Sequence, residues 1–293
     1  MKQYLQALQH VLENGQDKTD RTGVGTRSVF GYQMRFNLQE GFPATTTKKL
    51  AWRAVVSELL WFLEGSGDER RLAEILHGTR DSSKKTIWTA NAQADYWKPK
   101  AKYEGDLGRV YGVQWRDWQA ADVYFNPAIS GNILMAKSVD QLTNLIEGIK
   151  KDPSGRRHIL SAWNPGELDQ MALPPCHVLS QFDVTNGKLS CQLYQRSCDM
   201  FLGVPFNIAS YSLLTYIIAN ECGLEVGDFV WTGGDVHIYS NHFDAVREQL
   251  TRTPKELPQL SFPKDKKIAD FVVDDFVLQN YNPDSAISAP MAV

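Results

Sequence analysis

Hydrophobic and polar positions recur along this chain with two periods, and each period predicts a different kind of element. Residues 2–14 and 138–151 carry apolar side chains three or four positions apart, which is typical of helices with one buried face. The second segment opens with S-V-D-Q, the form of a capping box. Residues 51–64 and 208–222 are apolar on nearly every side, which predicts two buried helices.

The strand-like period appears in four other segments, namely residues 29–36, 158–163, 178–184 and 189–195. Asn186-Gly187 stands between the last two, and this dipeptide predicts a tight hairpin. Gly233-Gly234 predicts another tight turn, with His237 and Tyr239 after it on one strand face. Helices and strands together indicate an α/β (α+β) protein, and we find no repeat or linker that divides residues 1–293 into more than one domain.

Three polar segments interrupt these elements. The stretch 66–87 is predicted to contain a surface insertion near 73–85, and residues 119–137 are predicted to be a loop excursion. Residues 20–26 form a glycine-containing loop, but a strand pattern follows where a phosphate-binding loop would need a helix. Arg21 in this loop is therefore either a solvated side chain or a phosphate ligand.

One thiol stands out as a candidate nucleophile. Cys176 follows Pro174-Pro175, which keep the segment out of a helix, and the predicted hairpin returns Arg196 to its level. A nearby cation stabilises the thiolate that nucleophilic chemistry requires, so we expect Arg196 to lower the pKa of Cys176. The alternative is a buried structural thiol, which is the interpretation we adopt for Cys191, Cys198 and Cys222.

Other polar residues allow two interpretations each. Glu58 lies in an apolar helix, where it either pairs with a cation or has a raised pKa suited to moving protons. Asn207 is placed as the N-cap of the helix 208–222, but its amide can also recognise a ligand edge. Arg156 and Arg157 precede a strand and point to opposite faces, so one of them can reach a ligand of a second subunit.

Composition narrows the class of protein. The chain has 293 residues, of which 43% are hydrophobic and 22% charged, and these are the proportions of a soluble globular protein. A net charge of -3 argues against a general nucleic-acid binder. Four cysteines without framework spacing, and no apolar signal region or membrane-length run, predict a cytoplasmic protein. The cysteines and histidines lack metal-ligand spacing, so we expect no metal.

The chain resembles the folate-dependent thymidylate synthases that use a cysteine nucleophile, and the resemblance extends over almost its whole length. The motifs that carry it are DRTGVGT (20–26), TTTKK (45–49), ELLWFL (58–63), GDLGRVYGVQWR (105–116), RRHILSAWNP (156–165), MALPPCH (171–177), CQLYQRSCDMFLGVPFNIASY (191–211), GDVHIYSNH (234–242) and APMAV (289–293). So many long motifs in one order are more specific than any single short pattern.

The resemblance implies a reductive methylation of dUMP to dTMP, with 5,10-methylenetetrahydrofolate as the donor of carbon and hydride. The residues that it assigns to the chemistry are Cys176, Glu58, Tyr111, Asn207, Arg196 and Asp199. Those that it assigns to dUMP are Arg21, Gln195, Arg196, Ser197, Asp199, Asn207, His237 and Tyr239, together with Arg156 and Arg157 from the second subunit of a homodimer. Those that it assigns to the folate are Lys48, Ile87, Trp88, Asn91, Leu173, Asp199, Gly203, Phe206 and Ala292. It also implies a large mixed, mostly antiparallel sheet, with helices on one face and the second subunit on the other.

A few positions depart from the family pattern. Family members commonly have threonine and asparagine at Gly67-Asp68, aspartate at Thr89 and proline at Arg109, and some have a second tryptophan at Asn91. Two alternatives follow from the resemblance: a deoxyuridylate hydroxymethylase, in which water captures the methylene intermediate, and a non-catalytic nucleotide- or RNA-binding protein on the same scaffold. A deoxycytidylate hydroxymethylase is expected to carry aspartate at position 207, where this chain has Asn207.

Overall fold

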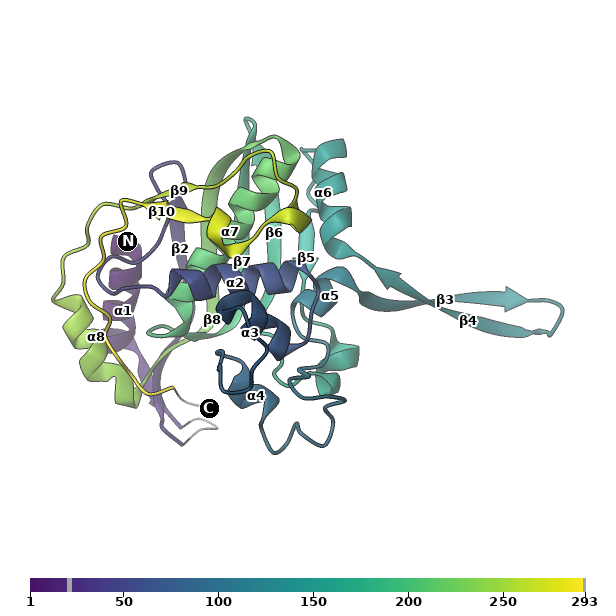
Figure 1. Cartoon of the computed structure of the whole chain (residues 1–293), viewed down its shortest axis with the longest axis horizontal. Coiled ribbons are helices and arrows are strands. Elements are labelled where there is room, and N and C mark those ends of the chain that lie inside the picture. The colour runs from purple at the N-terminus through teal and green to yellow at the C-terminus, as the bar shows by residue number, and fades with distance from the viewer. Residues whose placement is uncertain (20–22, 292–293) are drawn as a thin grey trace.

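A six-stranded sheet forms the centre of the computed structural model, which describes residues 1–19 and 23–291 (Figure 1). The strands lie in the order β1 (Gln16–Lys18), β2 (Thr26–Asn37), β8 (Glu225–Tyr239), β7 (Lys188–Asp199), β6 (His177–Thr185) and β5 (Ile159–Ser161). Only β7 and β8 pair in parallel among these neighbours; the other pairs are antiparallel. The predicted mixed, mostly antiparallel sheet is therefore confirmed.

Helices cover one face of this sheet. Their bounds are α1 (Lys2–Asn14), α2 (Trp52–Leu63), α3 (Glu69–His77), α4 (Thr89–Ala92), α5 (Gly112–Arg116), α6 (Gln141–Lys151), α7 (Gly203–Cys222) and α8 (Phe243–Leu250). The helix α7 packs on β7 and β8, and α2 packs on α7. On the covered face Leu193 and Trp231 are fully buried, whereas Tyr194 on the opposite face keeps 39% of its surface exposed. The hydrophobic effect thus holds the helical layer to one side.

The β6–β7 hairpin has the geometry that its sequence predicts. Asn186 and Gly187 both have positive φ, at 53° and 73°, as a two-residue turn with Asn-Gly requires. By contrast, Gly233-Gly234 does not form a turn, since both residues lie inside the long strand β8. A Cβ atom at Gly233 would stand 2.3 Å from the ring of Trp231. The glycine there makes room for a neighbouring indole instead of reversing the chain.

Two predicted helix starts are corrected by the structure. The helix α7 begins at Gly203, so Asn207 is inside it and is not an N-cap. Pro205 is accepted in this first turn because its missing N–H would have no partner in the helix. At α6 the cap is Asp140, whose side chain accepts a hydrogen bond from the Thr143 backbone N–H at 3.0 Å. The predicted capping box at residues 138–141 is therefore wrong.

The polar segments contain more regular structure than predicted. Residues 66–87 include α3, which Asp68 caps by accepting from the Arg70 N–H at 2.9 Å, while 78–85 is largely exposed. The predicted loop 119–137 is instead the hairpin of β3 (Trp118–Asn126) and β4 (Gly131–Val139), which projects from the body (Figure 1). Strong strand formers such as Val123 and Ile133 favour this pairing even though few of them are buried.

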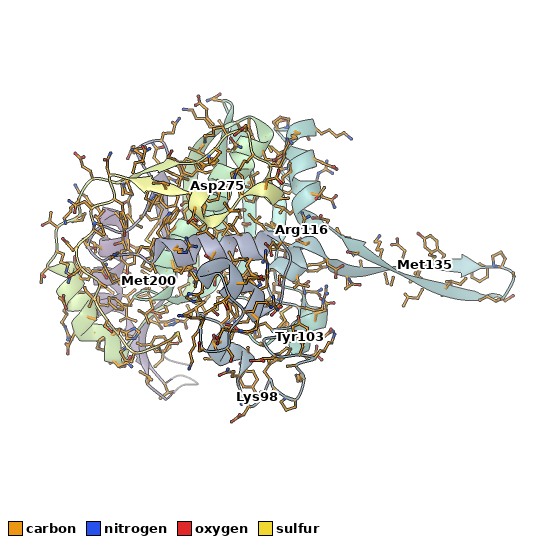
Figure 2. The ribbon with its side chains drawn as sticks, in the orientation of Figure 1. Lys98, Tyr103, Arg116, Met135, Met200 and Asp275 are labelled. Atoms are coloured by element: carbon orange, nitrogen blue, oxygen red, sulfur yellow. The ribbon has the colours of Figure 1, made fainter. Side chains whose placement is uncertain are left out.

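Most of the side chains that the structure describes in this hairpin are exposed to solvent. Figure 2 shows Met135 on the projecting arm and Met200 inside the body; their exposed fractions are 56% and 0%.

The C-terminal part of the chain adds the short strand pair β9 (Gln259–Ser261) and β10 (Val277–Gln279). The 3-10 helices are η1 (Pro165–Gln170), η2 (Ser240–His242), η3 (Ile268–Asp270) and η4 (Val273–Asp275). No helix of the described chain is long and apolar enough to span a membrane.

Candidate active site

Cys176 lies where the start of β6 meets the end of β7. The Arg196 backbone N–H donates to the Cys176 carbonyl at 2.9 Å. The Arg196 guanidinium donates to the carbonyls of Pro174 and Pro175 at 2.8 and 2.9 Å. The two prolines thus position the arginine as well as the thiol. The structure places Arg196 beside Cys176, as the hairpin spacing predicts.

Two opposing effects act on the pKa of Cys176. Burial raises the pKa of the Cys176 thiol above its usual value, and the positive charge of Arg196 opposes this effect without overcoming it. Arg196 therefore lowers the pKa of Cys176 as predicted, but burial, which the sequence did not indicate, has the larger effect. Because the desolvation cost falls on the charged form, the thiol is the resting form and needs a further cation or a base to become a nucleophile.

Glu58 is a buried acid without a counter-ion among the described residues. Its carboxylate, 6% exposed, accepts a hydrogen bond from Trp88 Nε1 at 2.7 Å. Burial raises the pKa of Glu58 to about 7, although the hydrogen bond from Trp88 opposes the shift. The pairing of Glu58 with an arginine, one of its two possible roles, is not what the structure shows. A carboxyl group with a pKa near neutrality is suited to taking up and releasing protons.

Tyr111 connects this acid to the thiol segment. Its ring packs against Trp88 and His177, with centroids 5.7 and 5.1 Å away. The Cys176 backbone N–H donates to the Tyr111 hydroxyl oxygen at 2.7 Å. Tyr111 also has φ of 27°, in a region that residues other than glycine rarely adopt. Burial raises the pKa of Tyr111 well above its usual value, so the phenol is protonated at neutral pH.

Asn207 is oriented by a chain of side-chain amides. Trp231 Nε1 donates to Gln195 Oε1 at 2.9 Å, and Gln195 Nε2 donates to Asn207 Oδ1 at 3.0 Å. The indole N–H can only donate, so it sets the orientation of Gln195 and, through it, that of Asn207. The amide of Asn207 is thereby prepared to recognise one pattern of donors and acceptors.

Polar residues at the ends of β7 and β8 lie side by side. In the parallel register Ser197 pairs with Asp235, and Asp199 pairs with His237. His237 Nδ1 is 3.1 Å from Asp235 Oδ1, and its ring packs edge-on against Tyr239 at 5.2 Å. Asp199 accepts from the N–H groups of Phe201 and Leu202 at 3.0 and 3.1 Å, which fixes its carboxylate.

The residues predicted to contact a folate are less uniform. Ile87 is 55% exposed although Trp88 next to it is buried, and Leu173 and Phe206 are half-buried. Asn91 lies in the short helix α4, and Gly203 begins α7. Lys48 is buried, and its ammonium donates to the Phe201 carbonyl at 2.5 Å. Burial lowers the pKa of Lys48 to about 8. Here the lysine faces the protein interior.

Within a single chain, some of the predicted site residues are not seen next to Cys176. Arg156 and Arg157 are exposed on the approach to β5, and neither forms an ion pair within the described parts of the chain. Arg21 and Ala292 lie outside the described residues.

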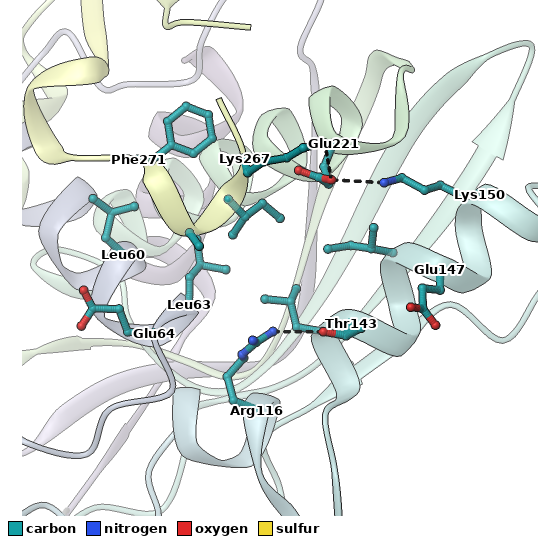
Figure 3. A pocket seen from close by; sticks show the side chains of 14 residues that line it. Leu60, Leu63, Glu64, Arg116, Thr143, Glu147, Lys150, Glu221, Lys267 and Phe271 are labelled. Atoms are coloured by element: carbon teal, nitrogen blue, oxygen red, sulfur yellow. Dashed lines mark hydrogen bonds and ion pairs between the residues drawn. The ribbon is translucent and has the colours of Figure 1, made fainter. Parts of the chain in front are cut away.

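A cavity of about 540 Å³ lies between α2, α5, α6, α7 and η3, and none of the predicted site residues lines it (Figure 3). Its lining mixes acids, bases and aliphatic side chains.

Two polar clusters in the protein interior were not predicted from the sequence. In one, the Thr89 hydroxyl donates to Glu69, which also forms a buried ion pair with Arg70. In the other, Glu167 accepts hydrogen bonds from Arg109 and Gln114. The departures at positions 89 and 109 are thus explained by internal partners. The only signal for these clusters in the sequence is that Thr89 and Arg109 depart from the family pattern.

A model of the family described as thymidylate synthase matches residues 2–293.

Proposed function

The chain belongs to the thymidylate synthase family, and from this premise we propose that it converts dUMP to dTMP with 5,10-methylenetetrahydrofolate, producing dihydrofolate. The observation that carries the proposal is the assembly of Cys176, Arg196, Tyr111 and Glu58 at one place, from segments far apart in the sequence. This set contains a nucleophile, a cation, a phenol and an acid with a pKa of about 7.

The first task of the protein is to hold the nucleotide and ionise the thiol. No carboxylate of the described chain pairs with Arg196, so its positive charge is available to a phosphate dianion. We expect Arg21, Ser197 and the partner-supplied Arg156 and Arg157 to join it. Additional cations shift the balance at Cys176 toward the thiolate, which can then add to C6 of the uracil ring.

The second task is to stabilise charge and move protons. Addition at C6 makes an enolate, and the oriented amide of Asn207 supplies a fixed dipole at the uracil edge. We expect His237 and Tyr239, whose rings are in contact, to hold the ribose hydroxyl. We expect Glu58, partly ionised near neutral pH, to be the final acceptor of the proton lost from C5, with the Tyr111 hydroxyl passing on its own proton as it takes up the one from C5.

We expect the residues assigned to the folate to bind a flat heterocyclic cosubstrate. Exposed Ile87 and half-buried Leu173 and Phe206 are apolar side chains that a stacked ring can cover, and Asp199 is a fixed acceptor for its N–H groups. The folate supplies the one-carbon unit and the hydride. A contact between Lys48 and the glutamate tail requires its side chain to turn outward from Phe201.

A homodimer is part of this proposal. Arg156 and Arg157 are exposed, and the outer face of the sheet carries partly exposed apolar residues such as Ile159 and Tyr194. A second copy on this face would bury both and bring the arginines to the neighbouring phosphate site. Mixing Cys176→Ser with Arg156→Glu/Arg157→Glu subunits should then restore activity in hybrid dimers, since one site becomes complete. Absence of any restoration after subunit exchange would contradict the shared site.

The decisive test is product analysis. Incubation with dUMP and methylenetetrahydrofolate should give equal amounts of dTMP, measured by mass spectrometry, and dihydrofolate, measured by absorbance. Cys176→Ser should abolish both products, whereas Cys222→Ser, at a half-buried thiol on α7, should leave them unchanged. Hydroxymethyl-dUMP with tetrahydrofolate would overturn the proposal in favour of a hydroxymethylase, and nucleotide binding without a product would favour a non-catalytic protein.

A further inference from the structure

The backbone at Tyr111 is strained, and strain of this kind needs a cause. With φ of 27° and ψ of -88°, Tyr111 occupies a conformation that costs about 1–3 kcal/mol and persists only where the surroundings enforce it. The phenol at the end of this residue accepts the Cys176 N–H. Hydrogen bonds on both sides of Tyr111 hold this conformation.

A single buried carboxylate oxygen binds both flanks. Glu167 on η1 is 8% exposed, and its Oε2 accepts from Arg109 Nε at 2.7 Å and from Gln114 Nε2 at 2.7 Å. Arg109 is two residues before Tyr111 and Gln114 is three residues after it. Asn164 Nδ2 adds a third donor to the same oxygen at 3.1 Å. One acceptor therefore closes the segment into a loop around Tyr111.

Further bonds tighten this loop. Gln114, which is fully buried, also donates to the Arg109 carbonyl at 2.9 Å, and the Arg109 N–H donates to the Gln170 carbonyl at 3.0 Å. The Arg109 guanidinium reaches Asp117 as well, with Nη1 3.1 Å from Oδ2 and Nη2 bonded to the backbone carbonyl. Asp117 directly precedes β3, so the root of the projecting hairpin belongs to the same network.

We propose that Glu167 is a positioning residue for Tyr111: through Arg109 and Gln114 it enforces the strained backbone that holds the phenol at the Cys176 amide. This inference rests on the proposed function for its kinetic consequences but not for its structural ones. Glu167 touches neither the thiol nor Asn207 and acts only through Tyr111. When its charge is removed, Tyr111 relaxes, and the step that needs the phenol slows.

The kinetic test separates addition of the thiolate from removal of the C5 proton. A 5-fluoro analogue of dUMP can accept Cys176 at C6 but has no C5 proton to lose, so adduct formation with it bypasses the second step. In Glu167→Gln we expect kcat with dUMP to fall about tenfold or more, with KM for dUMP and the rate of fluoro-adduct formation within twofold of wild type. An equal fall in both steps would overturn the proposal, as would an unchanged kcat.

The structural test does not need activity. Hydrogen exchange at the Cys176 amide should be faster in Glu167→Gln and in Tyr111→Phe. The first variant displaces the Tyr111 hydroxyl oxygen that accepts this amide, and the second removes it. The double variant should be no faster than Tyr111→Phe alone, since both changes act through one contact. Additive increases, or unchanged exchange in Glu167→Gln, would contradict the assignment even if the wild-type protein made no dTMP.

A control removes a carboxylate elsewhere. Asp275 on η4, labelled in Figure 2, accepts from Lys266 Nζ at 2.7 Å and from the Val272 N–H at 2.8 Å, and it shares no hydrogen bond with the Tyr111 segment of the described chain. Asp275→Asn should leave the exchange of the Cys176 amide and the ratio of the two kinetic steps unchanged. If it reproduces the Glu167→Gln pattern, a general loss of stability is the cause, and the positioning role is wrong.

Discussion

Glu58 on α2 and Glu167 on η1 are both carboxylates inside the protein, with 6% and 8% of their surface exposed. Glu58 receives one hydrogen bond, from Trp88, and no described cation pairs with it. Glu167 receives three hydrogen bonds, one of them from the guanidinium of Arg109. Both regions thus bury a carboxylate, but only Glu167 receives enough hydrogen bonds to replace the water that it loses on burial.

This difference explains what each residue can do. Burial disfavours a charged carboxylate unless donors and cations replace the lost water. Glu58 has only one such donor and no cation among the described residues, so its pKa rises to about 7, where it can exchange protons. Glu167 has the replacement and serves as an anchor for the backbone around Tyr111. Catalytic and structural roles are thus separated by the number of donors and not by burial.

The largest expected effect comes from Glu58→Gln. The amide keeps the shape and the contact with Trp88 but cannot exchange a proton, so kcat should fall by about 10²–10⁴. Removing an uncompensated buried acid should not lower the free energy of unfolding at pH 8. Steady-state assays and urea denaturation measure the two quantities. A loss of less than threefold in kcat would show that Glu58 moves no proton in the slow step.

Glu167→Ala, unlike Glu58→Gln, should lower the free energy of unfolding. It leaves buried Gln114 and Asn164, and half-buried Arg109, without their shared acceptor, although Arg109 keeps its ion pair with Asp117. Breaking a buried pair of this kind costs about 3–5 kcal/mol in unfolding free energy. Urea denaturation of Glu167→Ala, with Asp275→Asn as the matched control, measures this cost. If the two variants lose equal stability, the network around Glu167 is not a special anchor.

The pH dependence of stability should distinguish the wild type from Glu58→Gln. The folded pKa of about 7 lies above the ordinary value of 4.5, so between these values the folded protein holds a proton that the unfolded chain has released. Wild-type stability should therefore fall by about 3 kcal/mol relative to Glu58→Gln as the pH rises from 4.5 to 7, and then level off. Denaturation series at several pH values measure the difference. A constant difference would contradict the raised pKa.

The smallest expected effect comes from Trp88→Phe. The hydrogen bond from Trp88 lowers the pKa of Glu58 against the effect of burial, so its loss should raise that pKa further. One hydrogen bond to a charged group is worth about 1.5–3 kcal/mol at most, and relaxation reduces the visible shift to about one unit or less. The pH profile of kcat should move upward accordingly. A downward shift would mean that water replaces the indole as a better donor.

Local signals in the sequence predicted many of the elements but mistook some of their limits. Asn186-Gly187 predicts a turn because both positions need positive φ, and that requirement is local. Gly233 carries the same kind of signal, but the nearby Trp231 ring is what demands a glycine there. The loop predicted at 119–137 is a hairpin, because strand propensity prevails even where the side chains remain exposed.

The sequence by itself determined the family motifs, the main elements and the residue types available for chemistry, because periodicity and motif order depend only on neighbours along the chain. Only the tertiary structure decided how those residues behave. The donor to Glu58 is 30 residues away, the guanidinium on Glu167 is 58 residues away, and the hydroxyl at the Cys176 amide is 65 residues away. Protonation and strain depend on burial and on such distant partners, and no local pattern contains either.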